Sequence, residues 1–556
     1  MSRPMAMSVR AMGAALIAIA LGRPHSLAAQ YPSGGRPAGY RPGIDVTDYD
    51  LSIDLPDTGA TIEARAVLTV KRTARVDTLV LDLLDLRVDS VYVNRASVRF
   101  KRDAATISIP LPGGSGDELS VVVKYGGHPV DGLIIHADAA RWTAFADNWP
   151  NRGRHWIPSV DHPSDKATVS WTVRAPSERK VIANGKLVEE APLSAQMGAR
   201  PRTITRWRES RPIPVYLMVI AVAPLDHLDL GPSACGRSDF GCVEQTVYVF
   251  PEDRAFLPGP FAESRAMVDW FSTIIGPFPY EKLSHLESST RFGGMENASA
   301  IFYPEKAFRE RTLDVGTVAH ETAHQWFGDA VTEREWAHVW LSEGFATYFA
   351  ALWTEHSRGD SAFRAERIDL RKTVVESDVV ASRPVIDTTQ TDYLKLLNAN
   401  SYPKGGFVLH MLRRLVGDSA FFIGIADYYA RRRDSTAMTD DLRRAVEARA
   451  HVDLAWFFDQ WLKRPGFAQL STSSSYDPKE RRVILEIRQG QRFAPYRFPL
   501  LVDLTQTDGT VRRTTIQIQA TATQRITLPF DLSAAPRSIR LDPDVDLLAT
   551  IVGPQP

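Results

Sequence analysis

Hydrophobic and polar positions alternate with a period of two through much of the first half of the chain. Residues 49–55 (Tyr-Asp-Leu-Ser-Ile-Asp-Leu), 66–70 and 106–111 place an apolar side chain at nearly every second position. Successive side chains of a β-strand point to opposite faces, so this pattern predicts strands with one buried face. Turn residues interrupt it at short intervals. We therefore expect a large antiparallel β domain at residues 45–249.

The apolar spacing lengthens in the middle of the chain and shortens again near its end. Apolar residues recur at helical spacing in residues 261–275, 317–327, 342–353, 407–415 and 439–449, which predicts a mainly helical domain at 250–466. Alternation returns in 482–487, 499–504 and 514–518, with Thr507-Asp508-Gly509-Thr510 as a hairpin turn. A β-sandwich at 467–552 follows from this, and the fold class is multidomain α+β.

The N-terminus has the pattern of an export signal. Arg3 and Arg10 precede an apolar run at 11–21, and small residues at 26–29 offer a cleavage site. The alternative is an uncleaved anchor, but the apolar run is too short to span a bilayer. We expect a signal peptide at 1–29, a flexible leader at 30–44, and export to the periplasm or the medium without membrane insertion after cleavage.

Composition narrows the choice of partners. A chain of 556 residues is expected to form several domains. Its 66 basic and 66 acidic residues balance, so the net charge favours neither a nucleic acid nor an anionic membrane as partner. The two cysteines, Cys235 and Cys242, could form a disulfide across a turn between two strands, or remain free thiols. Export favours the disulfide.

The candidate chemistry centres on His320-Glu321-Thr322-Ala323-His324, followed by Glu343. Histidines four residues apart lie on one face of a helix and can bind one ion, while Glu321 between them can reach a water on that ion. Two His ligands and the carboxylate of Glu343 leave the fourth position open, as in catalytic zinc sites. We expect one Zn²⁺ per chain. The alternative is a chance occurrence of the motif.

A second motif, Gly293-Gly294-Met295-Glu296-Asn297, comes shortly before the expected zinc helix and after an expected strand at 283–287. Two glycines let one backbone approach another closely, as a peptide lying along a strand edge requires. Glu296 would then project a carboxylate beside the metal. Alone, the motif could be a simple turn.

Taken together, these motifs resemble the gluzincin aminopeptidases, the family of aminopeptidase N and leukotriene-A hydrolase. The resemblance rests on motifs that occur in the family's order at 49–55, 277–282, 293–297, 320–328, 340–348, 402–405 and 457–461. It covers residues 45–466. It implies an N-terminal β-saddle and a thermolysin-like catalytic domain, with the β-sandwich behind them.

The resemblance also implies roles for single residues. His320, His324 and Glu343 would bind zinc, and Glu321 would activate the water. Gly293 to Asn297 would bind the substrate, with Glu296 holding its free α-ammonium. Tyr402 would donate a hydrogen bond to the oxyanion of the tetrahedral intermediate.

The sequence departs from the family in two places. Relatives usually carry Gln or Glu where this chain has Asp147 and Trp149. Either Asp147 supplies a second carboxylate for the ammonium, with Trp149 offering a π face, or Trp149 packs the loop and Glu296 acts alone. In addition, nothing after Gln469 resembles the helical C-terminal domain that covers the cleft in many relatives.

The expected function is zinc aminopeptidase action on peptides. One alternative is a zinc hydrolase of a small non-peptide substrate, such as the epoxide opened by one family branch. Another is a non-catalytic scaffold, which the complete set of motif residues disfavours. The oligomeric state and the preferred first residue stay open.

Overall fold

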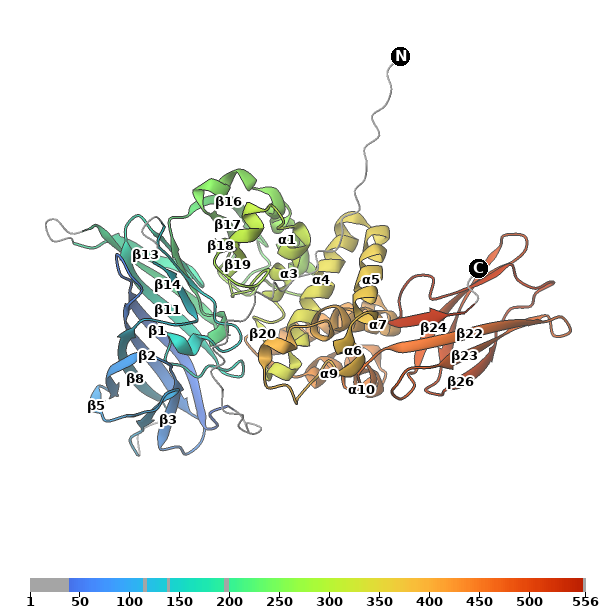
Figure 1. Ribbon diagram of the computed structural model, residues 1–556, viewed down its shortest axis with the longest axis horizontal. Coiled ribbons are helices and arrows are strands. Elements are labelled where there is room, and N and C mark those ends of the chain that lie inside the picture. The colour runs from blue at the N-terminus through green and yellow to red at the C-terminus, as the bar shows by residue number, and fades with distance from the viewer. Residues whose placement is uncertain (1–39, 114–117, 138–140, 195–199, 554–556) are drawn as a thin grey trace, which may run out of the picture.

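The computed structural model describes residues 40–113, 118–137, 141–194 and 200–553, arranged as three parts in a row (Figure 1). A β-rich N-terminal part lies at one end, a part with most of the helices lies in the middle, and a second β part lies at the other end. This is the expected multidomain α+β class. The predicted signal peptide and most of the predicted leader lie outside the described residues.

The N-terminal part is built on an eight-stranded sheet in the order β13-β14-β11-β1-β2-β8-β4-β5, with two smaller sheets, β12-β15-β10-β9 and β3-β7-β6. Its strands are β1 (Ile44–Asp54), β2 (Ile62–Arg72), β3 (Thr78–Asp82), β4 (Arg87–Val93), β5 (Ala96–Val98), β6 (Lys101–Arg102), β7 (Thr106–Pro110), β8 (Glu118–Gly127), β9 (Leu133–His136), β10 (Thr143–Ala146), β11 (Lys166–Pro176), β12 (Lys180–Ala183), β13 (Lys186–Pro192), β14 (Arg202–Pro214) and β15 (Ile220–Ala223).

The alternation in β1 has the predicted consequence. Tyr49, Leu51 and Ile53 are fully buried on one face, because strand residues two apart share a side. The large sheet is antiparallel except where β1 runs parallel to β11.

The last residues of the predicted leader, 40–44, are anchored to the N-terminal part. Tyr40 and Arg41 both bond to the Asp82 carboxylate at 2.6 Å, and β1 begins at Ile44. Residues 40–44 are therefore fixed to the N-terminal part, since two hydrogen bonds to one buried carboxylate hold them. Their Gly, Pro and Arg content alone gave no sign of this partner.

The boundary of the N-terminal part also differs from the prediction. β16 (Asp226–Ser233) and β17 (Val243–Val249) form a separate sheet with β18 (Lys282–Ser288) and β19 (Ala300–Pro304), in the order β16-β17-β18-β19. Because β17 pairs with β18, these strands belong to the central part, and the boundary falls between β15 and β16 rather than at residue 249. Alternation reveals a strand but not the sheet that it joins.

The central part contains the helices. They are α1 (Ser264–Ile274), α2 (Glu305–Arg309), α3 (Val315–His324), α4 (Trp340–Arg358), α5 (Asp360–Val375), α6 (Asp378–Ser382), α7 (Gly405–Val416), α8 (Asp418–Arg432), α9 (Thr439–Ala450) and α10 (Ala455–Leu462), with the short parallel pair β20 (Val331–Glu333) and β21 (Ser435–Ala437). All five predicted helical segments coincide with helices of this set. The prediction did not include α2, α5, α6, α8 and α10.

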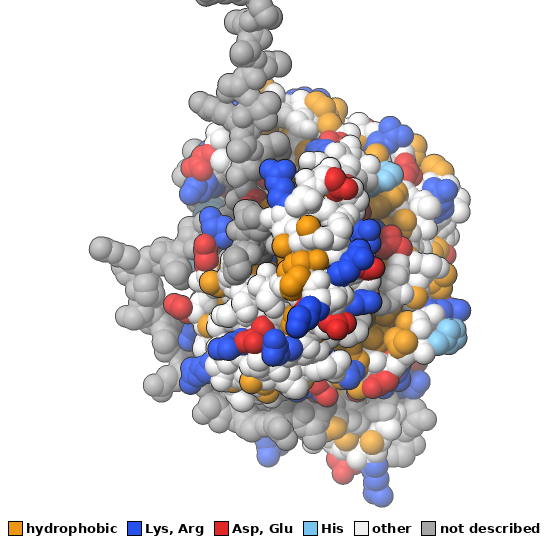
Figure 2. Space-filling model, turned by 90° about the vertical axis from the view of Figure 1, so that its right-hand side faces the viewer, with side chains coloured by type: hydrophobic (Ala, Val, Ile, Leu, Met, Phe, Trp, Pro, Cys, Tyr) orange, Lys and Arg blue, Asp and Glu red, His pale blue; other side chains and the backbone are white. Residues whose placement is uncertain are grey.

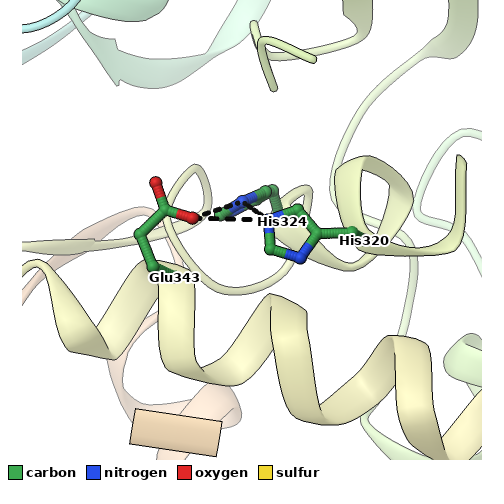
Figure 3. A group of neighbouring side chains, drawn as sticks. All are labelled: His320, His324 and Glu343. Atoms are coloured by element: carbon green, nitrogen blue, oxygen red, sulfur yellow. Dashed lines mark hydrogen bonds and ion pairs between the residues drawn. The ribbon is translucent and has the colours of Figure 1, made fainter. Parts of the chain in front are cut away.

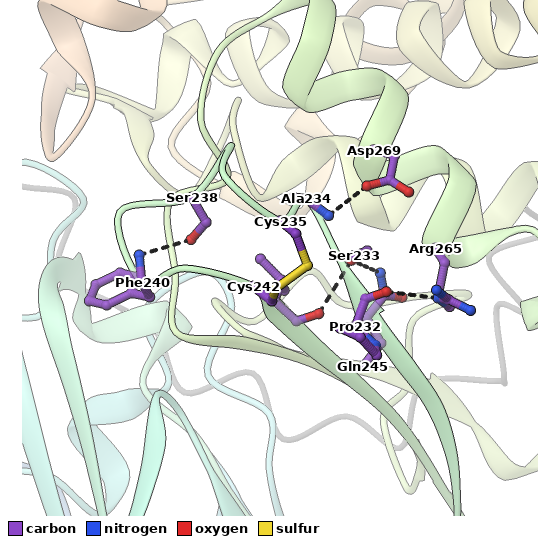
Figure 4. Close-up of a disulfide and its surroundings, with 11 residues drawn as sticks. Pro232, Ser233, Ala234, Cys235, Ser238, Phe240, Cys242, Gln245, Arg265 and Asp269 are labelled. Atoms are coloured by element: carbon purple, nitrogen blue, oxygen red, sulfur yellow. Dashed lines mark hydrogen bonds between the residues drawn. A yellow bond between two sulfur atoms is a disulfide. The ribbon is translucent and has the colours of Figure 1, made fainter.

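A disulfide closes the turn between β16 and β17, as predicted. Cys235 and Cys242 are joined with an S–S distance of 2.04 Å (Figure 4). Beside it, the backbone N–H of Ala234 donates to Asp269 of α1 at 2.6 Å, so the turn is tied to the first helix of the central part.

The C-terminal part consists of two sheets, β26-β23-β22-β28 and β25-β24-β27. Its strands are β22 (Ala468–Asp477), β23 (Arg482–Gln489), β24 (Phe498–Thr505), β25 (Val511–Ile518), β26 (Thr523–Thr527), β27 (Ser538–Leu541) and β28 (Ala549–Val552). The predicted hairpin is present, because β24 and β25 pair from Phe498 with Ile518 to Thr505 with Val511.

Basic and acidic side chains are interspersed on the face seen in Figure 2, as expected for a chain with no net charge. Across the described ranges, no helix combines the length and apolar character needed to cross a membrane.

Candidate active site

The predicted metal ligands meet between α3 and α4 (Figure 3). The helix α3 begins after Asp314, whose carboxylate caps it by accepting from the Thr317 N–H at 2.7 Å. One turn separates His320 from His324, so both imidazoles face α4. The Nε2 atoms of the two histidines are 3.1 Å apart, and Oε2 of Glu343 lies 3.3 and 3.4 Å from them.

This triangle of ligand atoms fits zinc. Tetrahedral coordination with bonds of about 2.0–2.2 Å places ligand atoms about 3.3–3.6 Å apart, close to the three separations in the structure. All three residues are buried, and two imidazoles with one carboxylate are a donor set that zinc accepts while keeping one position open.

Neighbouring groups orient these ligands. The Nδ1 atom of His324 lies 3.0 Å from the Ser342 hydroxyl and 3.2 Å from the Phe327 carbonyl, which directs its Nε2 toward the metal position. Burial would raise the pKa of Glu343, but hydrogen bonds from His320 and His324 outweigh it and bring the pKa to about 2. The Glu343 carboxylate is therefore ionised, as a metal ligand must be.

Tyr402 lies on the other side of Glu343. Its hydroxyl donates to Oε1 of Glu343 at 2.8 Å, and its ring stacks on His320 with centroids 5.9 Å apart. Burial raises the pKa of Tyr402 well above its usual range, so the phenol keeps its proton. The structure thus places Tyr402 beside two of the predicted ligands, with its hydroxyl on Glu343.

Glu321 is buried against the glycine motif. A side chain at position 294 would put its Cβ only 2.0 Å from Oε1 of Glu321, so the Gly294 backbone packs directly on this carboxylate. The predicted close approach of a peptide backbone to the two glycines stays a prediction, since the group that Gly294 meets in the structure is the Glu321 side chain. Burial raises the pKa of Glu321 well above its usual range.

The motif continues as a strand edge. Met295 exchanges two backbone hydrogen bonds with Phe302 of β19, at 2.8 and 2.9 Å. Gln325, one residue beyond α3, donates to the Glu296 carbonyl at 2.8 Å. Neither amide atom of Asn297, which is fully buried, has a hydrogen-bond partner in the described part of the chain.

Glu296 reaches the metal site as predicted. One carboxylate oxygen lies within 4.8 Å of ligand atoms of both Glu321 and His324. Burial raises its pKa to about 7, an increase that His324 partly offsets. The site therefore contains a buried carboxylate that the metal triangle does not use.

The prediction for Asp147 as a contact for the ammonium is not supported. Its fully buried carboxylate pairs with Arg152 at 2.7 Å and with Arg291 at 3.3 Å, so each oxygen already faces a cation. The Trp149 indole packs edge-on against Phe292 and Trp336, with centroids 5.9 and 5.2 Å apart. These contacts match the alternative in which Trp149 packs the loop.

Two family models match the regions that build this site. The Peptidase family M1 domain matches residues 262–461, and the Peptidase M1 N-terminal domain matches residues 46–217. The chain belongs to the M1 family of zinc peptidases. This confirms the resemblance to the gluzincin aminopeptidases and the zinc cofactor.

Named relatives within the family are aminopeptidases and zinc metallopeptidases. Glutamyl aminopeptidase of Bos taurus is 26% identical over 360 residues, covering 62% of this chain and 36% of that protein. Leucyl aminopeptidase of Saccharolobus solfataricus is 25% identical over 478 residues, covering 80% and 56%. The chain thus spans about a third to a half of the length of these relatives.

Solved structures agree on the fold. An M1 zinc metallopeptidase from Deinococcus radiodurans is 27% identical, with a TM-score of 0.67 and coverage of 76% of this chain and 94% of that one. Aminopeptidase A of Legionella pneumophila is 18% identical, with a TM-score of 0.78 and coverage of 92% and 59%. The second likeness concerns the fold alone.

Sequence analysis did not identify several residues of the site. Ser342 orients the ligand His324, and Gln325 orients the Glu296 backbone. Arg152 and Arg291 form ion pairs with Asp147. Ser342 and Gln325 adjoin recognised motif residues, so a helical model of α3 and α4 would have found them. The two arginines come from different domains and required the fold.

Proposed function

We propose that this chain is a zinc-dependent aminopeptidase, which hydrolyses the first peptide bond of peptides that have a free α-amine. The observation that carries the proposal is the position of Glu296, a buried carboxylate within 4.8 Å of Glu321 and His324 ligand atoms. In the described part of the chain, no lysine or arginine forms an ion pair with it, so a cation from the substrate can take that place.

Glu296 would receive the substrate's α-ammonium. A charge pair removed from water is strong when both partners are hydrogen-bonded, and costly when one is missing. Because the pair fixes the amine at Glu296, the first carbonyl of the peptide falls beside the metal ligands. The cleavage position is then one residue from the end.

Glu321 and Tyr402 would perform the chemistry around that carbonyl. When held by His320, His324 and Glu343, zinc supplies a Lewis acid that polarises the carbonyl and lowers the pKa of a water to about 7. The Glu321 carboxylate takes the proton of the attacking water and passes it to the leaving nitrogen. The Tyr402 hydroxyl, which rests on Glu343, turns to donate to the developing oxyanion.

The relatives support peptides as the substrate class. The Deinococcus radiodurans metallopeptidase was crystallised, as a variant, with a Tyr-Ser-Ala substrate. We extend this class to the present chain on the strength of the shared fold and the Glu296 geometry. The rival function, hydrolysis of a small non-peptide substrate, requires no carboxylate for an amine.

Turnover of a panel of aminoacyl-anilides tests the proposal. Free-amine anilides should be hydrolysed, chelation should abolish turnover, and added Zn²⁺ should restore it. An absence of turnover by a zinc-loaded, folded sample on the entire panel would contradict aminopeptidase action.

We also propose that the protein is exported. Arg3, Arg10 and the apolar run at 11–21 support a signal peptide, and the disulfide between Cys235 and Cys242 suits an oxidising compartment. Mass spectrometry of the mature N-terminus after expression in a secreting host tests this, and an intact Met1 on the accumulated protein would contradict it.

A further inference from the structure

The segment that carries Glu296 is held unequally at its two ends. On its C-terminal side, Met295 pairs with Phe302, and Glu296 accepts from Gln325. The next residue but one, Ala298, accepts from the Asn184 amide of the N-terminal part at 2.7 Å. Hydrogen bonds to the backbone of this segment, donated from both domains, therefore fix this end.

The N-terminal side has weaker local support. The Phe292 N–H reaches the Thr290 hydroxyl at 3.4 Å, and the following two residues are Gly293 and Gly294. Glycine loses more conformational freedom on ordering than any other residue. An ordered Gly-Gly edge therefore depends on contacts that come from outside the segment.

Four charged side chains supply such contacts in a closed ring. Arg291 pairs with Asp131 at 2.9 Å and with Asp147 at 3.3 Å. Arg152 pairs with the same two carboxylates, at 3.0 and 2.7 Å. Asp131, Asp147 and Arg152 belong to the N-terminal part, whereas Arg291 lies two residues before Gly293, the start of the glycine motif. Each guanidinium thus bridges the same two carboxylates, and Arg291 does so across the boundary between the domains.

Because part of this ring is buried, water screens its ion pairs less than it screens a surface ion pair. Asp147 is 0% exposed and Arg152 is 7% exposed, while Arg291 is 47% exposed. Burial would raise the pKa of Asp131, but Arg152 and Arg291 outweigh it and hold the pKa below its usual range. The Asp131 carboxylate of the ring is therefore ionised at neutral pH.

Packing extends the ring to the motif itself. The Arg152 guanidinium lies 5.8 Å from the centre of the Phe292 ring, and Trp149 packs against the same ring. Phe292, the residue after Arg291, thus packs against Arg152 and Trp149 of the loop that carries Asp147.

We propose that Arg291 and Asp147 are positioning residues, which act through the four-charge ring to hold the Gly293–Gly294 edge and thereby Glu296. This inference rests on the proposed role of Glu296 in binding the α-ammonium. It assigns Asp147 an indirect part in amine recognition, in place of direct contact. The same edge meets Glu321 at Gly294, so the ring also aligns the amine site with the proton acceptor.

Arg291→Gln is the decisive variant, because a half-exposed side chain can be changed without emptying the core. We expect KM for free-amine substrates to rise about 3- to 30-fold, as for contacts that act through a neighbour. The preference for free over N-acetylated substrates should fall by a similar factor. Arg291→Lys should give an intermediate result, since one ammonium cannot reproduce the fork that bridges two carboxylates.

Arg206→Gln is the matched control. Arg206 has the same 47% exposure and pairs with Glu189 in the N-terminal sheet, so its loss should leave KM and the amine preference unchanged. Arg291→Gln with lower kcat but unaltered KM and unaltered amine preference would overturn the positioning role. If the unaltered protein itself fails to prefer free amines, both the proposed function and this inference fall.

Discussion

The metal side and the amine side of the candidate site are built in different ways. His320, His324 and Glu343 come from two neighbouring helices of one domain, and their spacing follows from helical periodicity. Glu296 comes from an irregular strand edge that depends on a loop of another domain. The first arrangement follows from the local sequence of two helices, whereas the second forms only after two domains have packed together.

The metal side should show the largest effects. His324→Ala should lose the zinc and with it all activity. Glu321→Gln should keep one zinc per chain, while kcat falls by roughly 10²–10⁴-fold, because a general base is removed without a ligand. Metal analysis of both purified variants, paired with rates, checks this. Loss of zinc from Glu321→Gln would contradict the assignment of Glu321 as a general base that does not bind the metal.

The amine side should show an effect that depends on the substrate. Removing one partner of a desolvated charge pair costs about 2–5 kcal/mol, so Glu296→Ala should lose about 30- to 4,000-fold in kcat/KM on free-amine peptides. Zinc content should not change. Equal losses on acetylated and free substrates would show that Glu296 does not read the amine.

Tyr402 belongs to the metal side, where it contacts Glu343 and His320. We expect Tyr402→Phe to lower kcat by roughly 10²–10³-fold with little change in KM, as for loss of an oxyanion donor. Steady-state kinetics separate the two parameters. An elevated KM with kcat intact would instead place the hydroxyl in ground-state binding.

The smallest effect is expected at Trp149. Trp149→Phe keeps an aromatic ring against Phe292 and Trp336 but removes the indole N–H, so KM should stay within about twofold of the parent value. A tenfold rise in KM would mean that the indole contacts the ammonium, by a cation–π interaction worth about 0.5–2 kcal/mol.

The same contrast explains how far the sequence could be interpreted. Local periodicity and turn residues, which can be recognised in the sequence, were enough to predict some elements. These are the strands at 49–55 and 66–70, the helices around His320 and Glu343, and the hairpin at 507–510. The family match made Glu296 and Tyr402 visible as well. In contrast, the sheet that β16 and β17 join and the anchoring of residues 40–44 depend on partners that are distant in sequence.

Asp147 shows the limit most clearly. Position in a family motif suggested contact with the substrate, but its charge is taken up by Arg152 and Arg291. Neither arginine was among the predicted site residues, and one of them belongs to the other domain. A carboxylate near a site can therefore be assigned a role in substrate binding only when the cationic side chains that pair with it are known.

The most direct test of the central claim is mass spectrometry of a peptide of about ten residues during incubation with the zinc-loaded protein. The account predicts a ladder of products that shorten one residue at a time from the N-terminus, and an intact peptide when the α-amine is acetylated. Internal fragments, or equal cleavage of the acetylated peptide, would contradict recognition of the free amine at Glu296.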